Sequence, residues 1–190
     1  MNTETTRTQI MQHAERLIQE RGCNGFSYRD LAELIGIKTS SIHYYFAQKE
    51  DLLLAVAQDY YARWQAGIQT IDASVAADAK LRTYVDLHRR AFCDTERICL
   101  GAALAADLAS LPDAVRQAVR AFYQANEDWL AGVLEQGQRE GSVQVSGDVR
   151  TAARSLYAAL QGSLVGARLF KNSKRVHDLL PATLGLRDPA

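Results

Sequence analysis

Apolar residues recur at helical spacing near the N-terminus and predict a first helix. The repeating positions are Ile10, Met11, Ala14, Leu17 and Ile18. Steps of three and four residues place them on one face of an amphipathic helix. Gly22 follows the pattern and suits a C-terminal cap, so the first helix is expected to end there.

Two short helices are predicted next, with a glycine turn between them. Ser27 caps the second helix and Asp30 completes a box-like pair with it, while Gly36 ends this helix after Ile35. The third helix is expected to start with Thr39 as its cap. Its inward residues at helical spacing are Ile42, Tyr45 and Phe46. Two short helices joined by a glycine turn are typical of a helix-turn-helix.

A long periodic stretch opens at Lys49 and is expected to run on as a continuous linking helix. Glu50 and Asp51 suit the positive end of the helix dipole. The apolar positions that follow are Leu52, Leu53, Val56, Tyr60 and Trp64. We therefore expect a three-helix head over residues 1–48 and a larger helical domain over residues 49–190.

The rest of the chain continues the helical periodicity, so the predicted fold class is all-α. Further helices are predicted at 76–93, 98–109, 113–140, 148–170 and 174–184. The breaks between them are predicted at the Asp94–Thr95 turn, Pro112, Gly141 and Asn172–Ser173.

Charge and composition narrow the function classes. The formal net charge is zero, which excludes a strongly basic protein, and residues 1–49 hold six Lys/Arg against five acids. The three cysteines lack paired spacing, and no apolar run is long enough for a membrane span, so a cytoplasmic protein is expected. Because no metal-ligand spacing or phosphate loop is present, we expect no cofactor, no metal and no enzymatic activity.

The third helix has the size and surface of a helix that reads DNA. At ~1.5 Å per residue it is roughly 10 Å long, which fits a major groove about 12 Å wide. Its outward residues are Thr39, Ser40, Ser41, His43 and Tyr44. Arg29 suits a bidentate contact to guanine, and Lys38 and Lys49 suit flanking phosphates. The alternative is that these side chains are ordinary solvated surface.

Residues 10–53 resemble the DNA-binding head of the TetR family of repressors. The matching segments are Phe26-Ser27, Leu31-Ala32, Gly36-Ile37, Thr39-Ser40-Ser41, Ile42-His43-Tyr44-Tyr45-Phe46, and Lys49 with Leu52. The resemblance implies DNA contacts from Tyr28, Arg29, Lys38, Thr39, Ser40, Ser41, His43, Tyr44 and Lys49. This sequence differs from the family pattern in two places, where His43 replaces the usual Tyr and Ser40 the frequent Gly.

Small residues along the helix predicted at 148–170 indicate close packing against another helix. The partner is either a helix of the same subunit or the same helix of a second copy. The resemblance favours the second copy, because TetR-like proteins dimerise through their last two long helices. The expected homodimer interface comprises Leu156, Ala159, Leu160, Ser163 and Gly166.

Aromatic residues in the middle helices form either a plain core or the lining of an effector pocket, which the resemblance implies. The candidate pocket residues are Trp64, His88, Phe92, Cys99, Asp107 and Tyr123. The segment that starts at Cys99-Leu100 also resembles a subset of electrophile-sensing TetR repressors, in which the matching cysteine is reactive. The other reading is that Cys99 is a small buried apolar residue.

These observations together predict a ligand-responsive transcriptional regulator. The resemblance implies a homodimeric repressor that binds double-stranded operator DNA and leaves it when a small molecule binds the C-terminal domain. The alternative is a helix-turn-helix DNA-binding protein with no small-molecule effector. A cavity of several hundred Å³ in the larger domain favours the first, and a filled domain without a pocket favours the second.

Overall fold

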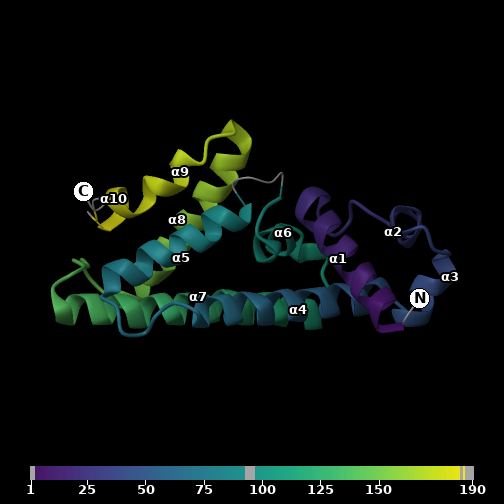
Figure 1. The fold of residues 1–190 in the computed structure, drawn as a ribbon, viewed down its shortest axis with the longest axis horizontal. Helices are drawn as coiled ribbons and strands as arrows, with labels where there is room; N and C mark the ends of the chain where they lie inside the picture. The colour runs from purple at the N-terminus through teal and green to yellow at the C-terminus, as the bar shows by residue number, and fades with distance from the viewer. Residues whose placement is uncertain (1–2, 93–96, 185, 187–190) are drawn as a thin grey trace. The chain divides into compact units, whose positions relative to one another are not determined.

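The computed structural model describes residues 3–92, 97–184 and 186, and in these residues every regular element is helical (Figure 1). The first half contains α1 (Thr3–Arg21), α2 (Tyr28–Ile35), α3 (Thr39–Tyr45), α4 (Lys49–Gln69) and α5 (Ala77–Phe92). The second half contains α6 (Leu100–Ala106), the 3₁₀ turn η1 (Leu108–Ser110), α7 (Asp113–Glu140), α8 (Val149–Phe170), α9 (Lys174–His177) and α10 (Leu179–Leu184). The all-α prediction is confirmed.

The chain divides into two compact units that are not consecutive in sequence. The first comprises residues 1–63 and 97–122, and the second comprises residues 64–96 and 123–190. The long helices α4 and α7 each contribute residues to both units. The boundary expected between residues 48 and 49 separates a DNA-binding part from the rest of the chain. The division into compact units does not test it, so it stays a prediction.

The first unit is built around α1, which packs on both α2 and α6. The apolar face predicted for α1 is buried, with Ile10, Ala14 and Ile18 fully covered. Leu31 of α2 and Ile42 of α3 are equally inaccessible to solvent. The helix-turn-helix is therefore held by a continuous apolar core, whose burial contributes on the order of 2 kcal/mol for each large side chain.

The second unit packs α8 against α5, α9 and α10. Leu81, Leu130 and Leu160 are among its buried apolar residues. Gly137 of α7 permits a close approach, because a Cβ there would lie 2.6 Å from the Cγ2 atom of Val143.

Two predicted helices differ in the structure. The helix expected over 174–184 is divided into α9 and α10, because Pro181 has no N–H to donate to the carbonyl of residue 177 and its ring would clash with that carbonyl. The helix expected over 98–109 is shorter, ending at Ala106 and followed by η1. The Asp94–Thr95 turn lies outside the described residues.

Among the helices of the described residues, none is both long enough and apolar enough to cross a membrane.

Candidate nucleic-acid interface

Helix α2 is fixed at both ends by its own sequence. The Ser27 side chain accepts a hydrogen bond from the Asp30 backbone N–H, and the Asp30 carboxylate accepts one from the Ser27 N–H at 2.7 Å. The Ser27 hydroxyl also donates to this carboxylate, and this bond and the one from the Ser27 N–H lower the pKa of Asp30. The predicted capping box is therefore present. Gly36 ends the helix in the left-handed conformation, with φ +75°, which glycine adopts without strain.

Helix α3 presents one side to the core and the other to solvent. Ile42 and Phe46 are 0% and 3% exposed and attach the helix to the first unit. The cap prediction was wrong by one residue, because Lys38 is the N-cap and its side chain makes no cap hydrogen bond. Tyr45, also expected inward, is half-buried and meets the Tyr44 ring edge-on at 5.1 Å.

Most residues predicted to contact DNA lie on the solvent side of α2 and α3. Tyr44 is 79% exposed, and the Arg29 side chain is 83% exposed. The other exposed residues of the set are Lys38, Ser40 and His43, and the half-buried ones are Thr39 and Ser41. We call these seven residues the α3 surface. It carries hydroxyl, imidazole and cationic groups that suit base edges and phosphates.

The prediction for Tyr28 needs correction. Its hydroxyl lies 3.0 Å from the carbonyl oxygen of Phe46 and 2.7 Å from that of Gln48, and its ring packs edge-on against His43. Burial, with a smaller contribution from Asp51, raises the pKa of Tyr28 to about 12. This tyrosine ties α2 to the turn after α3 and orients the α3 surface, rather than reaching DNA itself.

Lys49 is also engaged inside the head. Its ammonium group donates to the Phe26 carbonyl and lies 4.1 Å from the centre of the Phe26 ring. Burial lowers the pKa of Lys49. Of the three predicted cations, Arg29 and Lys38 are therefore the two that stand in solvent, and Arg29 pairs with Glu33 at 3.3 Å. An exposed pair of this kind is worth less than about 1 kcal/mol, so Arg29 exchanges readily to another anion.

Asp107 links the head to the residues around α6. Its carboxylate accepts a 2.7 Å hydrogen bond from the backbone N–H of Cys23, and Ser110 accepts one from the Asn24 side chain at 2.8 Å. Gly22 has φ +79°, and a Cβ there would lie 2.8 Å from an Asp107 carboxylate oxygen. The turn after α1 and the end of α6 are thus joined directly within the first unit.

The interior of the second unit gathers aromatic and polar side chains. The Asn126 side-chain oxygen accepts from the Tyr84 hydroxyl at 2.7 Å and from the Trp64 indole N–H at 3.1 Å. The His88 ring packs 4.4 Å from Trp64 and 4.6 Å from Tyr84, centre to centre. Trp129 stacks on Tyr84 at 4.8 Å.

His88 is fully buried, and one of its nitrogens is unused. Nδ1 lies 3.0 Å from the Tyr84 carbonyl oxygen, which can only accept, so Nδ1 carries the proton. Burial lowers the pKa of His88 to about 4, against a smaller opposing effect of that carbonyl. Nε2 is then a bare acceptor with no hydrogen-bond partner in the part of the chain that the structure describes, and the Gln161 amide is likewise unpartnered there.

The predicted effector residues are divided between the two compact units. Trp64, His88 and Phe92 lie together in the second unit, where Tyr123 meets Tyr157 edge-on at 5.2 Å. Cys99 and Asp107 belong to the first unit. Cys99 is 2% exposed, and its Sγ accepts a 3.6 Å hydrogen bond from the Tyr60 hydroxyl.

Sequence reasoning missed Asn126 and Gln161, although a signal was present. Asn126 follows Phe122 and precedes Leu130 at steps of four residues, so its position on α7 is a core position. Gln161 follows Tyr157 on α8 in the same way. A polar residue at an apolar helical register is a direct sign of a buried polar group.

The predicted interface on α8 is partly corrected. Leu156 and Leu160 are 5% and 1% exposed and pack inside the chain, so they present no surface to a second copy. Ala159, Ser163 and Gly166 are half-buried. The solvent-facing stripe lies beside them, at steps of three and four residues, and comprises Thr151, Ser155, Ala158, Gly162, Val165 and Leu169. We call this the α8 stripe.

Comparison with known proteins finds two family models along the chain. Residues 10–56 match the family model of bacterial regulatory proteins of the tetR family, and residues 77–183 match that of the tetracyclin repressor-like C-terminal domain. The chain is 24% identical over 187 residues to the HTH-type transcriptional repressor NemR of Escherichia coli K12, covering 95% of this chain and 94% of NemR.

Two solved structures share the architecture along nearly the whole chain. A TetR family transcriptional regulator from Agrobacterium tumefaciens is 30% identical, with a TM-score of 0.91, over 96% of this chain and 97% of that one. A TetR transcriptional regulator from Legionella pneumophila is 31% identical, with a TM-score of 0.85, over the same shares of the two chains.

Proposed function

The chain belongs to the TetR family of bacterial regulatory proteins, and from this membership we propose that it represses transcription as a homodimer that a small molecule releases from operator DNA. Its relatives are DNA-binding transcriptional regulators and not enzymes. The proposed place of action is the cytoplasm, where the operator DNA is.

The α3 surface is the proposed reading surface. With Ile42 and Phe46 buried behind it, α3 enters the major groove with Ser40 and Tyr44 in front. Arg29 reads one base pair and Lys38 neutralises a phosphate. The observation that carries this proposal is a two-turn helix with a fully apolar back and an exposed front of hydroxyl, imidazole and cationic groups.

The α8 stripe is the proposed dimer surface. Val165 and Leu169 are 48% and 74% exposed, which places apolar side chains in water on a helix whose other side is packed. A Cβ at Gly162 would meet nothing within 4 Å, so that position leaves room for a second helix. Close approach of two copies of α8 about a two-fold axis would cover this stripe and set the spacing of the two heads.

The cluster around His88 is the proposed effector site. A neutral imidazole with a bare Nε2 recognises a molecule that donates a hydrogen bond, and its aromatic neighbours suit an apolar or aromatic body. The buried Gln161 amide offers a further donor and acceptor. An unpartnered buried acceptor costs about 1–3 kcal/mol, which a ligand or an ordered water recovers.

Asp107 is the proposed relay to the head. It holds the turn after α1, while α4 and α7 supply residues to both units. An effector in the second unit shifts these two helices, which changes the position of the turn that Asp107 holds. The result is two states with different affinity for the operator.

Selection of bound sequences from a randomised DNA duplex pool tests the central proposal. We expect the purified protein to enrich a two-fold symmetric sequence with half-sites about one helical turn apart. Tyr44→Ala should abolish the enrichment, and Gln58→Ala, an exposed substitution on α4, should leave it intact. Enrichment that is unchanged by Tyr44→Ala would contradict the assignment of the α3 surface.

Two measurements test the dimer and the effector site separately. Val165→Glu should yield monomers in sedimentation, whereas Gln117→Glu, exposed on α7, should not.

Phenol and anisole test the effector site, because phenol has a hydrogen-bond donor and anisole has none. Phenol should bind more tightly in calorimetry, and His88→Phe should remove the difference. Equal binding of the two probes to the unmodified protein would contradict the proposed role of His88.

A further inference from the structure

His43 is held in one orientation on the α3 surface, although it is exposed to solvent. Its Nδ1 atom lies 3.4 Å from the carbonyl oxygen of Ala47, in the turn after α3. Its ring packs edge-on against the Tyr28 ring, with the two ring centres 4.8 Å apart. A side chain that is already restrained loses less conformational entropy when it binds a partner. His43 is therefore better suited to a directional contact than a mobile surface side chain.

The turn that carries Ala47 is itself fixed. The Tyr28 hydroxyl lies 3.0 and 2.7 Å from the carbonyl oxygens of Phe46 and Gln48, which precede and follow Ala47. The backbone N–H of Gln48 donates to the Asp51 carboxylate at 2.9 Å. The acceptor that faces Nδ1 is therefore in place before any DNA binds.

These contacts decide which nitrogen of His43 is offered to a partner. A backbone carbonyl can only accept, so Nδ1 carries the proton that points at Ala47. In the neutral imidazole, Nε2 is then an acceptor. Within the part of the chain that the structure describes, no group donates to Nε2. The polar atom that His43 leaves for DNA is thus an acceptor.

An acceptor at this position restricts the groups on DNA that His43 can contact. Phosphate oxygens only accept hydrogen bonds, and so do O6 and N7 of guanine and O4 of thymine in the major groove. The major-groove donors are the exocyclic amino groups, N6 of adenine and N4 of cytosine. A neutral His43 therefore suits adenine or cytosine and does not suit a phosphate.

We propose that His43 determines sequence specificity by accepting a hydrogen bond from the exocyclic amino group of an adenine or a cytosine in the major groove. The proposal rests on the proposed function, because it requires α3 to enter that groove. It gives the α3 surface two base-reading groups of opposite polarity, since Arg29 donates and His43 accepts. Each half-site should then have one position at which adenine or cytosine is preferred over guanine and thymine on the contacted strand.

Removal of single amino groups from the selected operator tests this contact. The sequence enriched from the randomised pool is resynthesised with purine in place of one adenine, or 2-pyrimidinone in place of one cytosine, at each position in turn. Binding is measured at about pH 8, where a free imidazole is neutral. One such change should weaken binding of the unmodified protein about tenfold more than binding of His43→Phe. Equal losses for the two proteins at every position would overturn the proposal.

The base that responds distinguishes adenine from cytosine, and two further variants test the acceptor itself. In His43→Gln the side-chain amide reaches as far as Nε2, whereas in His43→Asn it reaches only as far as Nδ1. The Gln variant should keep a preference at the responding position, and the Asn variant should lose it. Retention of the full preference by the Asn variant would contradict an acceptor at Nε2. The melting temperature confirms that each variant is folded, and the Asn variant replaces the Phe variant if the latter is not.

The salt dependence of binding distinguishes a base contact from a phosphate contact. Loss of one phosphate contact reduces the slope of log affinity against log salt concentration by about 0.9. His43→Phe should leave the slope unchanged, and Lys38→Ala should reduce it. A reduced slope in His43→Phe would mean that a charged imidazole contacts a phosphate, and it would overturn the proposal.

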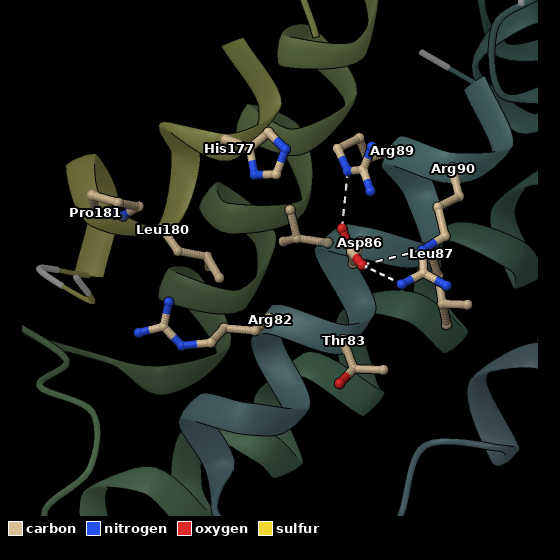
Figure 2. Close-up of a pocket in the computed structure, with 10 residues that line it drawn as sticks. Arg82, Thr83, Asp86, Leu87, Arg89, Arg90, His177, Leu180 and Pro181 are labelled. Carbon is tan, nitrogen blue, oxygen red and sulfur yellow. Dashed lines mark hydrogen bonds and ion pairs between the residues drawn. The ribbon is translucent and has the colours of Figure 1, made fainter. Parts of the chain in front are cut away.

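A control for charge alone is available on the second unit. Figure 2 shows the Asp86 carboxylate hydrogen-bonded to both Arg89 and Arg90. Arg90→Ala removes one positive charge from α5 and leaves the head intact. Its slope should equal that of the unmodified protein, so that the reduction in Lys38→Ala is assigned to a lost contact.

Failure of this proposal and failure of the proposed function give different results. If the unmodified protein enriches no sequence, the proposed function is wrong and this proposal is wrong with it. If a sequence is enriched but no amino group couples to His43, the α3 surface still reads DNA and only the role of His43 is wrong.

Discussion

The α3 surface and the interior of the second unit both gather polar side chains, but only the α3 surface keeps them in water. Tyr44 is 79% exposed, so its hydroxyl is satisfied by solvent when no DNA is present. His88 is fully buried with a bare Nε2, so its unoccupied state costs free energy. An exposed recognition surface thus has no free-energy penalty without its ligand, whereas a buried one is stabilised when its ligand binds. Substitutions in the first should change DNA affinity alone, and substitutions in the second should change stability.

The largest expected effect is that of Asn126→Leu in the second unit. Leucine cannot accept from the buried Tyr84 hydroxyl or from the indole N–H of the half-buried Trp64, so both groups lose this acceptor. The free energy of unfolding should fall by about 4 kcal/mol, at about 1–3 kcal/mol for each unsatisfied donor. Urea denaturation measures this, and a loss below 1 kcal/mol would show that the interior tolerates unpaired polar groups.

The pH dependence of stability is the next test. His88 has a pKa of about 4 in the folded state against 6.5 when unfolded, so the unfolded chain binds its proton first as the pH falls. Its contribution to stability is complete above pH 6.5 and is lost toward pH 4, by about 3 kcal/mol in total. Urea denaturation at pH 7.5 and 5.5 should show a loss of roughly 1 kcal/mol for the unmodified protein relative to His88→Phe. The same pH dependence in both proteins would mean that His88 is not held neutral.

Arg29→Ala should act on the exposed surface alone. We expect specific operator binding to weaken by about 2 kcal/mol, with discrimination lost at one base pair and thermal stability unchanged. Lys38→Ala is the matched substitution, since it should weaken binding to all sequences and reduce its salt dependence. Titrations at two salt concentrations distinguish the two, and an equal loss of sequence discrimination in both variants would refute the division between base reading and phosphate contact.

Tyr28→Phe is expected to have the smallest effect. It distinguishes residues that stabilise the protein from residues that contact DNA. Its hydroxyl serves the carbonyls of Phe46 and Gln48, so its loss should cost about 1 kcal/mol of stability and leave base preference unchanged. Tyr44→Phe should do the reverse, lowering DNA affinity at constant stability. A changed base preference in Tyr28→Phe would return that residue to the reading surface.

Local signals made the head predictable from sequence. The Ser27–Asp30 capping box begins α2 and the left-handed Gly36 ends it. Both signals depend only on residues within one turn of the helix end. The apolar back of α3 follows from periodicity alone. By contrast, Tyr28 and Lys49 have polar ends on long apolar bodies, so the pattern does not decide whether the end reaches water or a backbone carbonyl.

The second unit was less predictable because its polar residues depend on partners far along the chain. The acceptor for Trp64 is 62 residues away, at Asn126, and no local rule pairs them. The division of the last predicted helix was predictable, since Pro181 breaks the hydrogen-bond pattern four residues earlier. Asp107 was predicted to line the effector pocket, and a pattern of side chains cannot reveal its partner, because that partner is the backbone N–H of Cys23.

The composition of the first unit has a practical consequence for building chimeric regulators. A head exchanged at residue 48 or 63 would arrive without residues 97–122, and the incoming turn after its first helix would meet a carboxylate matched to Gly22 and Cys23 of this chain. A graft that moves residues 1–63 and 97–122 together keeps the contact between residue 107 and the turn at residues 22 and 23. Residues 22 and 107 are therefore expected to be exchangeable only as a pair.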